Sequence, residues 1–582
     1  MNKLYYTIVM SISQLAVRHL FTRLRFFTEF RMTNCKSLFS ALLLCILLLI
    51  SCTGNKNKDN SKTVFRYNET AGISSLDPAY AKDQACIWAT NQIYNGLVQL
   101  NEKLQVLPCI AKSWEISDNG LIYTFHLRND VLFHDDEPFK NGKGRKVTAS
   151  DFVYSFNRII DPKIASPGAW IFNNVNDSLS NNKFNFKALN DSTLLIGLKK
   201  PFPPFIGLLT MQYCSVVPKE IVEHYGKDFR KHPIGTGPFK LKMWKEGVKL
   251  TLAKNENYFE TDEKQRLPYL DAVAITFITD KQSVFLEFLK GNIDFMSGID
   301  PSYKDELLTR NGQLNPKYKN KVNLLTQPYL NTEYLGFLVD SLSPLLANSP
   351  TRFKAVRQAI NYGIDRKKMM KYLRNNIGFP GIYGFIPVGM PSFDSTKMMA
   401  YDYNPQRAKE LLSDAGFPDG EGLPEIMLSA TSSYIDLCEY IQHQLSEIGI
   451  KIKIDVNPPA TLREMVAKSK VVFFRGSWIA DYPDAENYLA LFYSKNFCPR
   501  GPNYTHFFSN AYDELYKSSQ YETNDSVRFE YYQKMNKFIM NEAPVVVLYY
   551  DQVLRFFQKN ISGLTSNPMN LLNLKYVKKQ NY

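Results

Sequence analysis

Apolar and polar residues follow a helical or a strand period through much of the second half of the chain. Residues 404–416 begin with Asn-Pro, space apolar residues three or four positions apart and end with Gly, which predicts a capped helix. Residues 437–449 repeat the helical period and lead into the alternating stretch 450–456, which predicts a strand. An apolar run from Val471 predicts another, buried strand before a loop over 478–484. This order of helix, strand, helix and strand predicts an α/β lobe.

Shorter periodic segments come before this lobe. Residues 64–114 alternate strand-like pieces with one helix near 83–94, and residues 123–133 alternate as a strand and turn do. Thr148 and Asp151 have capping-box spacing in front of another predicted helix. Two further elements are a helix over 352–365 and a strand over 545–550. The 582 residues exceed the roughly 250–300 at which a single core stops growing, so several lobes are expected.

Binding chemistry is expected in the loop after the strand that begins near residue 471. The loop sets the carboxylate of Asp481 between Trp478 and Tyr482, and Arg475 lies six residues upstream of Asp481. An aromatic side chain supplies an apolar wall, while a carboxylate and a guanidinium can hold the two charged ends of a zwitterion. The alternative is punctuation between strand and helix, in which Asp481 or Asp484 caps the following helix.

The same stretch resembles the G-W-x-A-D-Y signature of the peptide-binding solute receptors of ABC importers, the dipeptide and oligopeptide group of extracellular solute-binding proteins (family 5). The resemblance implies that Asp481 holds the α-ammonium group of a peptide and that Arg475 meets a carboxylate. Where the signature has Gly, this chain has Ser477, with Gly476 one position earlier. Ser477 and Ile479 are expected to bond the backbone of a peptide, and Tyr504 and Tyr549 lie near strings that contact the ligand in the family. The expected ligand-binding residues are Arg475, Ser477, Trp478, Ile479, Asp481, Tyr482, Tyr504 and Tyr549.

Further strings that resemble this family occur in order from residue 64 to about residue 570. They are S-L-D-P at 75–78, V-T-A-S-D-F-V-Y-S at 147–155, G-T-G-P-F at 235–239 and V-R-Q-A-I-N-Y at 356–362. The resemblance implies an α/β, three-lobed periplasmic-binding-protein-like fold, in which two α/β lobes close on the ligand. The expected segments are 64–94, 218–330 and 549–582 for lobe I, 95–217 for lobe II and 331–548 for the ligand-closing lobe III. Residues 136–146 form an insertion relative to the family pattern.

The first 51 residues are expected to be a signal peptide. Residues 37–51 form an apolar core that ends at Cys52 and is shorter than the about 20 apolar residues of a membrane span. Leu-Leu-Ile-Ser-Cys resembles a bacterial lipobox, which implies that Cys52 is lipidated and that residues 52–63 contain a polar tether. A simple N-terminal anchor with an incidental Cys is the alternative.

Basic residues are in excess, with a formal net charge of +14. Residues 1–51 contribute six Lys or Arg against one Glu, which leaves +9 for the remainder. Residues 1–31 form a long basic and aromatic preface that is unusual in a signal peptide, so translation is expected to begin at Met32. No Lys/Arg-rich run interleaved with aromatic residues has the scale of a nucleic-acid footprint, so nucleic acid is not an expected partner.

Five of the eight cysteines follow the lipobox, and none forms a C-x-x-C pair. An odd number leaves at least one thiol free or intermolecular in an oxidising compartment, and the sequence leaves open whether Cys86 pairs with Cys109.

Catalytic signatures such as H-E-x-x-H and G-x-S-x-G do not occur in the sequence. His134, Asp135 and Asp136 could touch a metal ion on their turn, but such a turn is more often solvated, so no metal or cofactor is expected. The expectation is a monomeric, non-enzymatic receptor of the bacterial cell envelope. It is lipid-anchored, faces the periplasm or cell exterior, and delivers di- or oligopeptides to ABC permease subunits. Alternatives are the same fold holding a metal chelate, haem or sugar, and a membrane-tethered hydrolase.

Overall fold

The computed structural model describes residues 62–176, 185–298, 300, 303–398 and 400–580, which belong to one compact unit, Lys62–Tyr582. The expected signal peptide, the expected start at Met32 and the expected lipid site at Cys52 lie outside the described residues. No helix in the described part of the chain combines the length and apolar character needed to cross a membrane.

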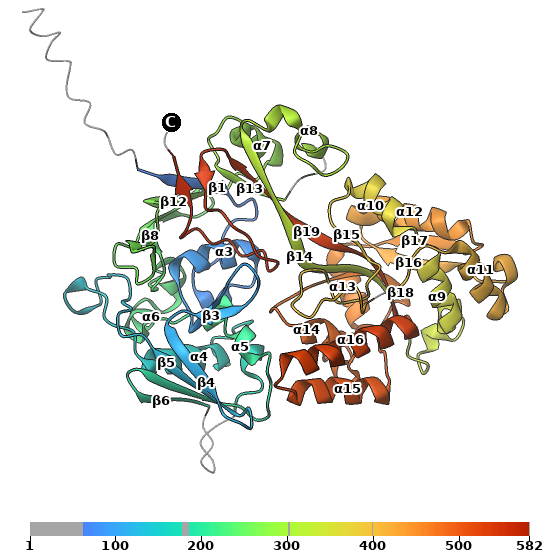
Figure 1. Ribbon diagram of the computed structural model, residues 1–582, viewed down its shortest axis with the longest axis horizontal. Coiled ribbons are helices and arrows are strands. Elements are labelled where there is room, and N and C mark those ends of the chain that lie inside the picture. Colours follow the sequence, from blue (N-terminus) through green and yellow to red (C-terminus); the bar gives the residue numbers. More distant parts are fainter. Residues whose placement is uncertain (1–61, 177–184, 299, 301–302, 399, 581–582) are drawn as a thin grey trace, which may run out of the picture. The chain divides into compact units, whose positions relative to one another are not determined.

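An 11-stranded sheet organises this unit, and two long antiparallel strands run through its middle (Figure 1). They are β14 (Val322–Phe337) and β19 (Val545–Gln558). One side of the pair continues through β13 (Phe295–Ser297), β1 (Val64–Asn68), β12 (Ala272–Thr276), β9 (Lys249–Lys254) and β8 (Phe239–Lys245). The other side continues through β18 (Phe473–Ile479), β16 (Ile426–Ala430) and β17 (Ile452–Val456), and β15 (Phe379–Pro380) also pairs with β19.

The expected lobe boundaries after residues 330 and 548 fall inside the two long strands. The register between β14 and β19 shifts between Pro328 and Thr332, close to the first of these boundaries. The chain therefore passes between the expected lobes I and III along continuous strands, and the shift marks an irregular point in the ladder.

The residues expected to form lobe II contain a separate four-stranded antiparallel sheet. Its order is β4 (Ala111–Ile116), β5 (Ile122–Leu127), β7 (Thr193–Gly197) and β6 (Phe186–Asn190). Helix α4 (Ala149–Ile160) packs on this sheet, with the ring of Phe156 5.2 Å from that of Phe186. Phe156 and Phe65 of β1 belong to the same hydrophobic core, so the expected lobes I and II share their interior.

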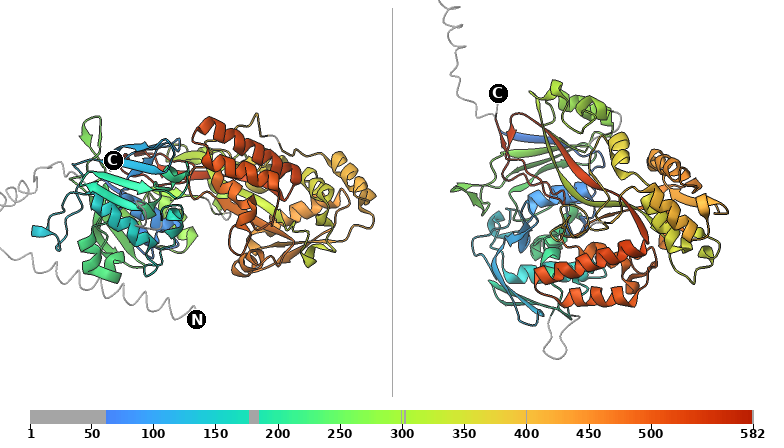
Figure 2. Two further views of the ribbon diagram at one scale, coloured as in Figure 1. Left: turned by 90° about the horizontal axis from the view of Figure 1, so that it is seen from below. Right: turned by 45° about the vertical axis from the view of Figure 1, so that its right-hand side comes forward.

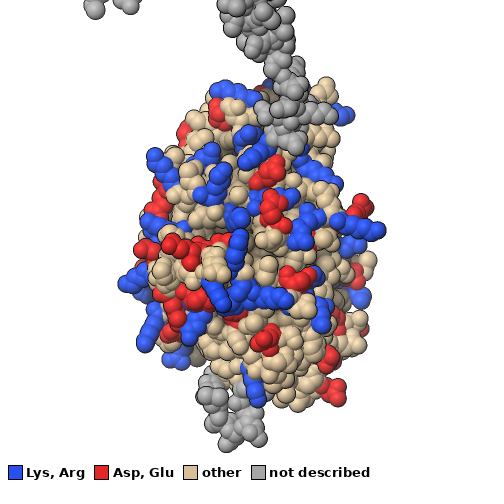
Figure 3. All heavy atoms as spheres, turned by 90° about the vertical axis from the view of Figure 1, so that its left-hand side faces the viewer, with Lys and Arg blue, Asp and Glu red and all other residues tan. Residues whose placement is uncertain are grey.

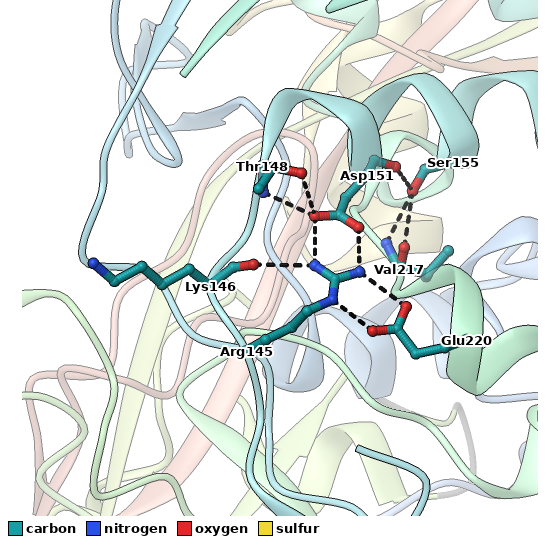
Figure 4. Close-up of polar contacts among 7 residues, drawn as sticks. All are labelled: Arg145, Lys146, Thr148, Asp151, Ser155, Val217 and Glu220. Atoms are coloured by element: carbon teal, nitrogen blue, oxygen red, sulfur yellow. Dashed lines mark hydrogen bonds and ion pairs between the residues drawn. The ribbon is translucent and has the colours of Figure 1, made fainter. Parts of the chain in front are cut away.

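The inserted segment 136–146 is fastened at its end by Arg145 (Figure 4). The guanidinium lies between two carboxylates, with Nη2 2.6 Å from Asp151 Oδ1 and 2.9 Å from Glu220 Oε2. Asp151 also accepts the backbone N–H of Thr148 at 2.8 Å, which confirms the predicted capping box of α4. One ion-pair network thus joins the insertion to the start of α4 and to α6 (Lys219–Tyr225).

Two hydrophobic cores cover the two faces of the sheet in the region expected to form lobe III. Neighbouring β14 residues divide between them, Tyr334 in one core and Leu335 in the other, because consecutive side chains of a strand point to opposite faces. The Leu335 core includes residues of α9 (Lys354–Tyr362), α10 (Arg366–Arg374), α11 (Pro405–Asp414) and α12 (Ile435–Ser446). The Tyr334 core includes residues of α13 (Pro459–Ala467), α15 (Asn510–Tyr521) and α16 (Asp525–Glu542), and both groups can be followed in Figures 1 and 2.

Most of the predicted elements are confirmed. The capped helix over 404–416 is α11, and the side chain of its N-cap Asn404 accepts the N–H of Arg407 at 3.0 Å. The helix near 83–94 is α3 (Gln84–Ile93). Two strand ends were misplaced. The strand predicted over 545–550 continues to Gln558. The strand that begins near Val471 continues to Ile479, because β18 stays paired with β14 that far, so Trp478 lies on the strand and not in the loop.

Shorter elements complete the described chain: β2 (Val98–Leu100), β3 (Val106–Pro108), β10 (Thr261–Asp262), β11 (Gln265–Arg266), β20 (Ile561–Ser562), β21 (Lys578–Lys579), α5 (Phe205–Leu208), α7 (Lys281–Leu289), α8 (Lys304–Leu307) and α14 (Glu486–Leu489).

The described cysteines are five buried free thiols, so Cys86 and Cys109 do not form a disulfide. His134 is buried and its Nε2 lies 2.9 Å from the carbonyl oxygen of Gly237. Within the described ranges, no group of three or more His, Cys, Asp or Glu side chains could hold a metal ion. On the face drawn in Figure 3, Lys and Arg side chains are interspersed with Asp and Glu.

Candidate functional site

Strand β18 leaves part of one edge open. Ala480, just past its end, donates its backbone N–H to the carbonyl of Leu330 at 2.9 Å. Consecutive residues of a strand direct their backbone groups to opposite edges, so Ser477 and Ile479 direct theirs away from β14. On that side β16 pairs with β18 at Phe474 alone. Among the described strands, none covers the edge at Ser477 and Ile479, where an extended backbone could pair.

Asp481 is tied to Trp478 through Asn487, a buried residue of α14. The amide Nδ2 of Asn487 donates to Oδ2 of Asp481 at 3.2 Å. Its Oδ1 accepts the indole N–H of Trp478 at 2.9 Å and the backbone N–H of Asp481 at 3.2 Å. One amide therefore fixes the positions of the Trp478 indole and the Asp481 carboxylate.

Neither Asp481 nor Asp484 is the N-cap of α14: the cap position is Ala485, which makes no side-chain capping bond. Oδ1 of Asp484 accepts the backbone N–H of Glu486 at 2.9 Å and the hydroxyl of Tyr532 at 2.6 Å. The capping alternative is thus wrong, and the carboxylate of Asp481 accepts a hydrogen bond from Asn487.

Asp481 lines a pocket of ≈ 370 Å³. Segments far apart in the sequence form its walls, and the aromatic members of the lining are Trp88, Trp170, Tyr213 and Tyr329. Within the described part of the chain, no basic side chain forms an ion pair with Asp481, although Lys82 lines the same pocket. The pocket therefore combines aromatic walls with an acidic group that lacks a counter-charge.

Desolvation controls the electrostatics of this pocket. Loss of solvent around Asp481 raises the pKa of its carboxyl, and the hydrogen bond from Asn487 opposes that shift in part. Burial, together with the nearby charge of Asp481, raises the pKa of Tyr213 to about 12. Asp481 is nevertheless an exposed residue that lines the pocket, so a ligand cation can reach it.

Tyr482 is buried beneath this pocket and does not line it. Its hydroxyl donates to the carboxylate of Glu486, and its ring lies 6.1 Å from that of Trp170. Its side chain belongs to the core shared by the expected lobes I and II, so it joins the β18 loop to those lobes.

Arg475 lies on β18 and is already paired. Its guanidinium forms an ion pair with Glu333 and stacks 3.4 Å from the ring centre of Tyr434. The side chains of Arg475 and Glu333 are 12% and 5% exposed, so the pair is largely buried. Nδ2 of Asn331 adds a hydrogen bond of 3.1 Å to Glu333.

A second ion pair lies beside the first. Nη2 of Arg374 is 2.7 Å from Asp551, and its guanidinium is 4.1 Å from the ring centre of Tyr549. Tyr549 is directly opposite Glu333 in the β14–β19 register, so the structure brings Arg475 and Tyr549 to one cluster. Tyr504 packs against the hydrophobic core that contains Tyr334. It is not part of the pocket lining or of the cluster around Arg475 and Tyr549.

Local sequence patterns gave no signal for several residues of this site. Asn487 shares a stretch with Asp481, but nothing in its spacing predicts that it bonds both Trp478 and Asp481. Tyr213 and Glu333 come from segments far upstream, and tertiary contact alone assigns them.

The family model of the bacterial extracellular solute-binding proteins, family 5, middle region, matches residues 105–497. The chain belongs to this family. It is 27% identical over 505 residues to the glutathione-binding protein GsiB of Salmonella choleraesuis (strain SC-B67), covering 86% of this chain and 91% of that protein. It is 26% identical over 528 residues to heme-binding protein A of Haemophilus influenzae, covering 88% and 91%.

A solved family 5 structure has the same fold. The ABC transporter-associated periplasmic binding protein DppA from Helicobacter pylori, in complex with the peptide STSA, superposes with a TM-score of 0.69 at 26% identity, covering 90% of this chain and 100% of that one. The expected family and the α/β, multi-lobed binding-protein fold are confirmed. Family 5 proteins are extracellular solute-binding proteins that deliver ligands to ABC permeases.

Proposed function

We propose that this chain captures di- or oligopeptides for an ABC importer and that Asp481 holds the α-ammonium group of the ligand. The observation that carries the proposal is that Asp481 lines a pocket with aromatic walls and has no ion-pair partner in the described residues. A charge-assisted hydrogen bond from an ammonium supplies the missing partner, and such bonds are about twice as strong as neutral ones.

The open edge of β18 supports recognition of peptide backbone. Ser477 and Ile479 direct their backbone N–H and C=O groups to this edge, where an extended peptide can add as a strand. Backbone bonds do not distinguish side chains, so broad selectivity across peptide sequences follows.

Arg475 meets a ligand carboxylate only by sharing its guanidinium with Glu333. The two ion pairs of this cluster bring two cations, Arg475 and Arg374, together with two anions, Glu333 and Asp551. Since these charges cancel, we infer that the α-ammonium contact at Asp481 dominates ligand affinity.

Further parts of the proposal rest on the sequence. The protein acts as a monomeric receptor without catalysis, and a lipid on Cys52 anchors it to the membrane near its permease. Mass spectrometry of the mature N-terminal peptide tests the anchor: an unmodified Cys52 in protein from the native membrane contradicts it.

Relatives named for glutathione and haem make the ligand class the first question to test. Titration calorimetry with Ser-Thr-Ser-Ala, its N-acetylated form and haemin separates the candidates. Binding of the unmodified peptide, with much weaker binding of the acetylated one, supports the proposal. Equal binding of both peptides, or binding of haemin alone, overturns it.

A further inference from the structure

Four side chains gather at the end of the β14–β18 pair that lies away from Asp481. Asp340 follows β14, Ser469 precedes β18, and Cys498 and His506 lie on the loop between α14 and α15. Because β14 and β18 are antiparallel, the end of one meets the start of the other. The seven residues of β18 put this cluster roughly 20 Å from the ligand pocket, at 3.2–3.4 Å a residue.

The cluster has the arrangement of a nucleophile, a base and an orienting acid. The thiol sulfur of Cys498 lies 3.2 Å from Nε2 of His506. Nδ1 of His506 lies 3.3 Å from Oδ2 of Asp340. The hydroxyl of Ser469 lies 3.0 Å from Nε2 of His506 and 3.2 Å from the Cys498 sulfur. A thiol that can pass its proton to a histidine held by a carboxylate is the general form of an activated nucleophile.

The surroundings suit a histidine that has taken up this proton. Nδ1 of His506 faces the carboxylate of Asp340, and Nε2 also lies 3.2 Å from the backbone oxygen of Cys498. The protonated ring therefore has an acceptor at each nitrogen. Phe497 stacks on the His506 ring at 4.7 Å with an interplanar angle of 4°, which fixes its orientation.

Two residues of the cluster have a strained backbone. Ser469 and His506 have φ of 53° and 51°, the left-handed region that costs a residue other than Gly free energy. Both are the direct neighbours of the Cys498 thiol. Strained residues of this kind persist where the surrounding structure holds them and are concentrated at functional sites.

Cys498 differs from the other four described cysteines. It alone has a histidine nitrogen within hydrogen-bonding distance among the described residues. Burial raises the pKa of Cys109 to about 12 and that of Cys438 to about 11, and it also raises the pKa values of Cys86 and Cys214. These four thiols are therefore poor nucleophiles in the folded protein.

A pocket lies on the His506 side of the cluster. This pocket of ≈ 340 Å³ is lined by Asp340, His506, Phe497 and Phe508, among others. Cys498 itself is 5% exposed and does not line this pocket, so a reagent has to be small enough to pass His506. Family 5 proteins lie outside the cytoplasm, where low-molecular-weight disulfides persist.

We propose that Cys498, His506 and Asp340 form a thiol modification site at which Cys498 exchanges with a small disulfide. His506 accepts the proton of the Cys498 thiol, and the thiolate attacks one sulfur of the disulfide R–S–S–R. The new Cys498–S–S–R bond forms as the R–S–S–R bond breaks, and the departing thiolate takes the proton from His506. Asp340 positions the imidazole. Reduction of the mixed disulfide by a thiol returns the free Cys498, so the modification is reversible.

The test uses the full-length protein in detergent and the probe 2-hydroxyethyl disulfide. This probe is neutral and has no α-ammonium group, so it does not depend on Asp481, and its result is independent of the proposed peptide function. Intact mass gives the rate and stoichiometry of modification, and peptide mapping gives the site. We expect one modification, at Cys498, without denaturant and its absence in Cys498→Ser.

His506→Asn removes the proton acceptor while Asn tolerates the positive φ of that position. We expect this variant to react about 100-fold more slowly, since a positioned general base supplies factors of 10²–10⁴. Asp340→Asn retains the shape of the orienting side chain, and we expect it to slow the reaction at least tenfold. Cys438→Ser is the matched control and leaves the rate unchanged. Thermal melting followed by circular dichroism shows whether each variant folds. If His506→Asn does not fold, the rate measured for Asp340→Asn tests the proposal in its place.

Two results overturn the proposal. One is an equal modification rate in wild type, His506→Asn and Asp340→Asn, all folded. The other is that Cys498 reacts only in denaturant, together with the other four cysteines, which marks it as an ordinary buried thiol.

Discussion

Asp481→Asn is the change that separates ligand binding from structure most sharply. It removes one negative charge and retains the shape of the side chain next to Asn487 and Trp478. Desolvation raises the pKa of Asp481, so its ionised form is disfavoured in the folded protein, and a neutral side chain there does not lower stability. We therefore expect an unchanged or slightly raised melting temperature at neutral pH.

The effect on peptide affinity is large because a ligand ammonium closed into the pocket would lose its counter-charge. Breaking one partner of a buried charge pair costs on the order of 3–5 kcal/mol. At 1.4 kcal/mol per tenfold, Asp481→Asn weakens unmodified peptides by roughly two to three and a half orders of magnitude. N-acetylated peptides lack the charge, so they bind weakly to wild type and lose little more in the variant.

Titration calorimetry of the two proteins with unmodified and acetylated peptide checks this expectation. The four affinities form a double-mutant cycle whose coupling term is the ammonium–carboxylate contact. Equal affinities in all four titrations, with both proteins folded, would refute the assignment of Asp481.

Three further predictions follow from the same geometry. Asn487→Leu removes the hydrogen-bond acceptor of the Trp478 indole and the donor to Asp481. We expect calorimetry to show about tenfold weaker peptide binding, from loss of roughly 1–1.5 kcal/mol of binding free energy. Unchanged affinity would contradict the role of Asn487. Glu333→Gln leaves the largely buried Arg475 without its anion, so we expect the free energy of unfolding in urea titrations to fall by about 3–5 kcal/mol. The double variant Glu333→Gln/Arg475→Met regains most of this loss. Equal stability of wild type and Glu333→Gln would contradict the pairing. Ammonium binding needs the ionised carboxyl of Asp481, and the pKa of this carboxyl is raised. As the pH is lowered, the peptide affinity of wild type therefore begins to fall at a higher pH than it would with an ordinary aspartate, whereas Asp481→Asn shows no such fall. Parallel pH profiles of the two proteins would contradict this prediction.

The sequence predicted those features that depend on neighbours in the chain. The period and caps of 404–416 specify α11, and the apolar run from Val471 specifies β18 apart from its end. The end of β18 was misplaced because pairing with β14, and not local propensity, carries the strand to Ile479.

Other features depend on contacts between distant segments. Arg475 was expected to be available to a ligand carboxylate, but its partner Glu333 lies 142 residues upstream and no local pattern connects them. Tyr213 and Trp170 reach the pocket from the chain between α4 and α6, and the fold alone brings them to Asp481. The side of a strand that stays open, as at Ser477, is likewise a property of the assembled sheet.

Mass spectrometry of the molecules that co-purify with the protein tests the central claim most directly. The account predicts peptides of varied sequence that share a free α-amino group, present with wild type and lost with Asp481→Asn. Recovery of a single non-peptide ligand such as haem or a metal chelate, retained equally by both proteins, would contradict it.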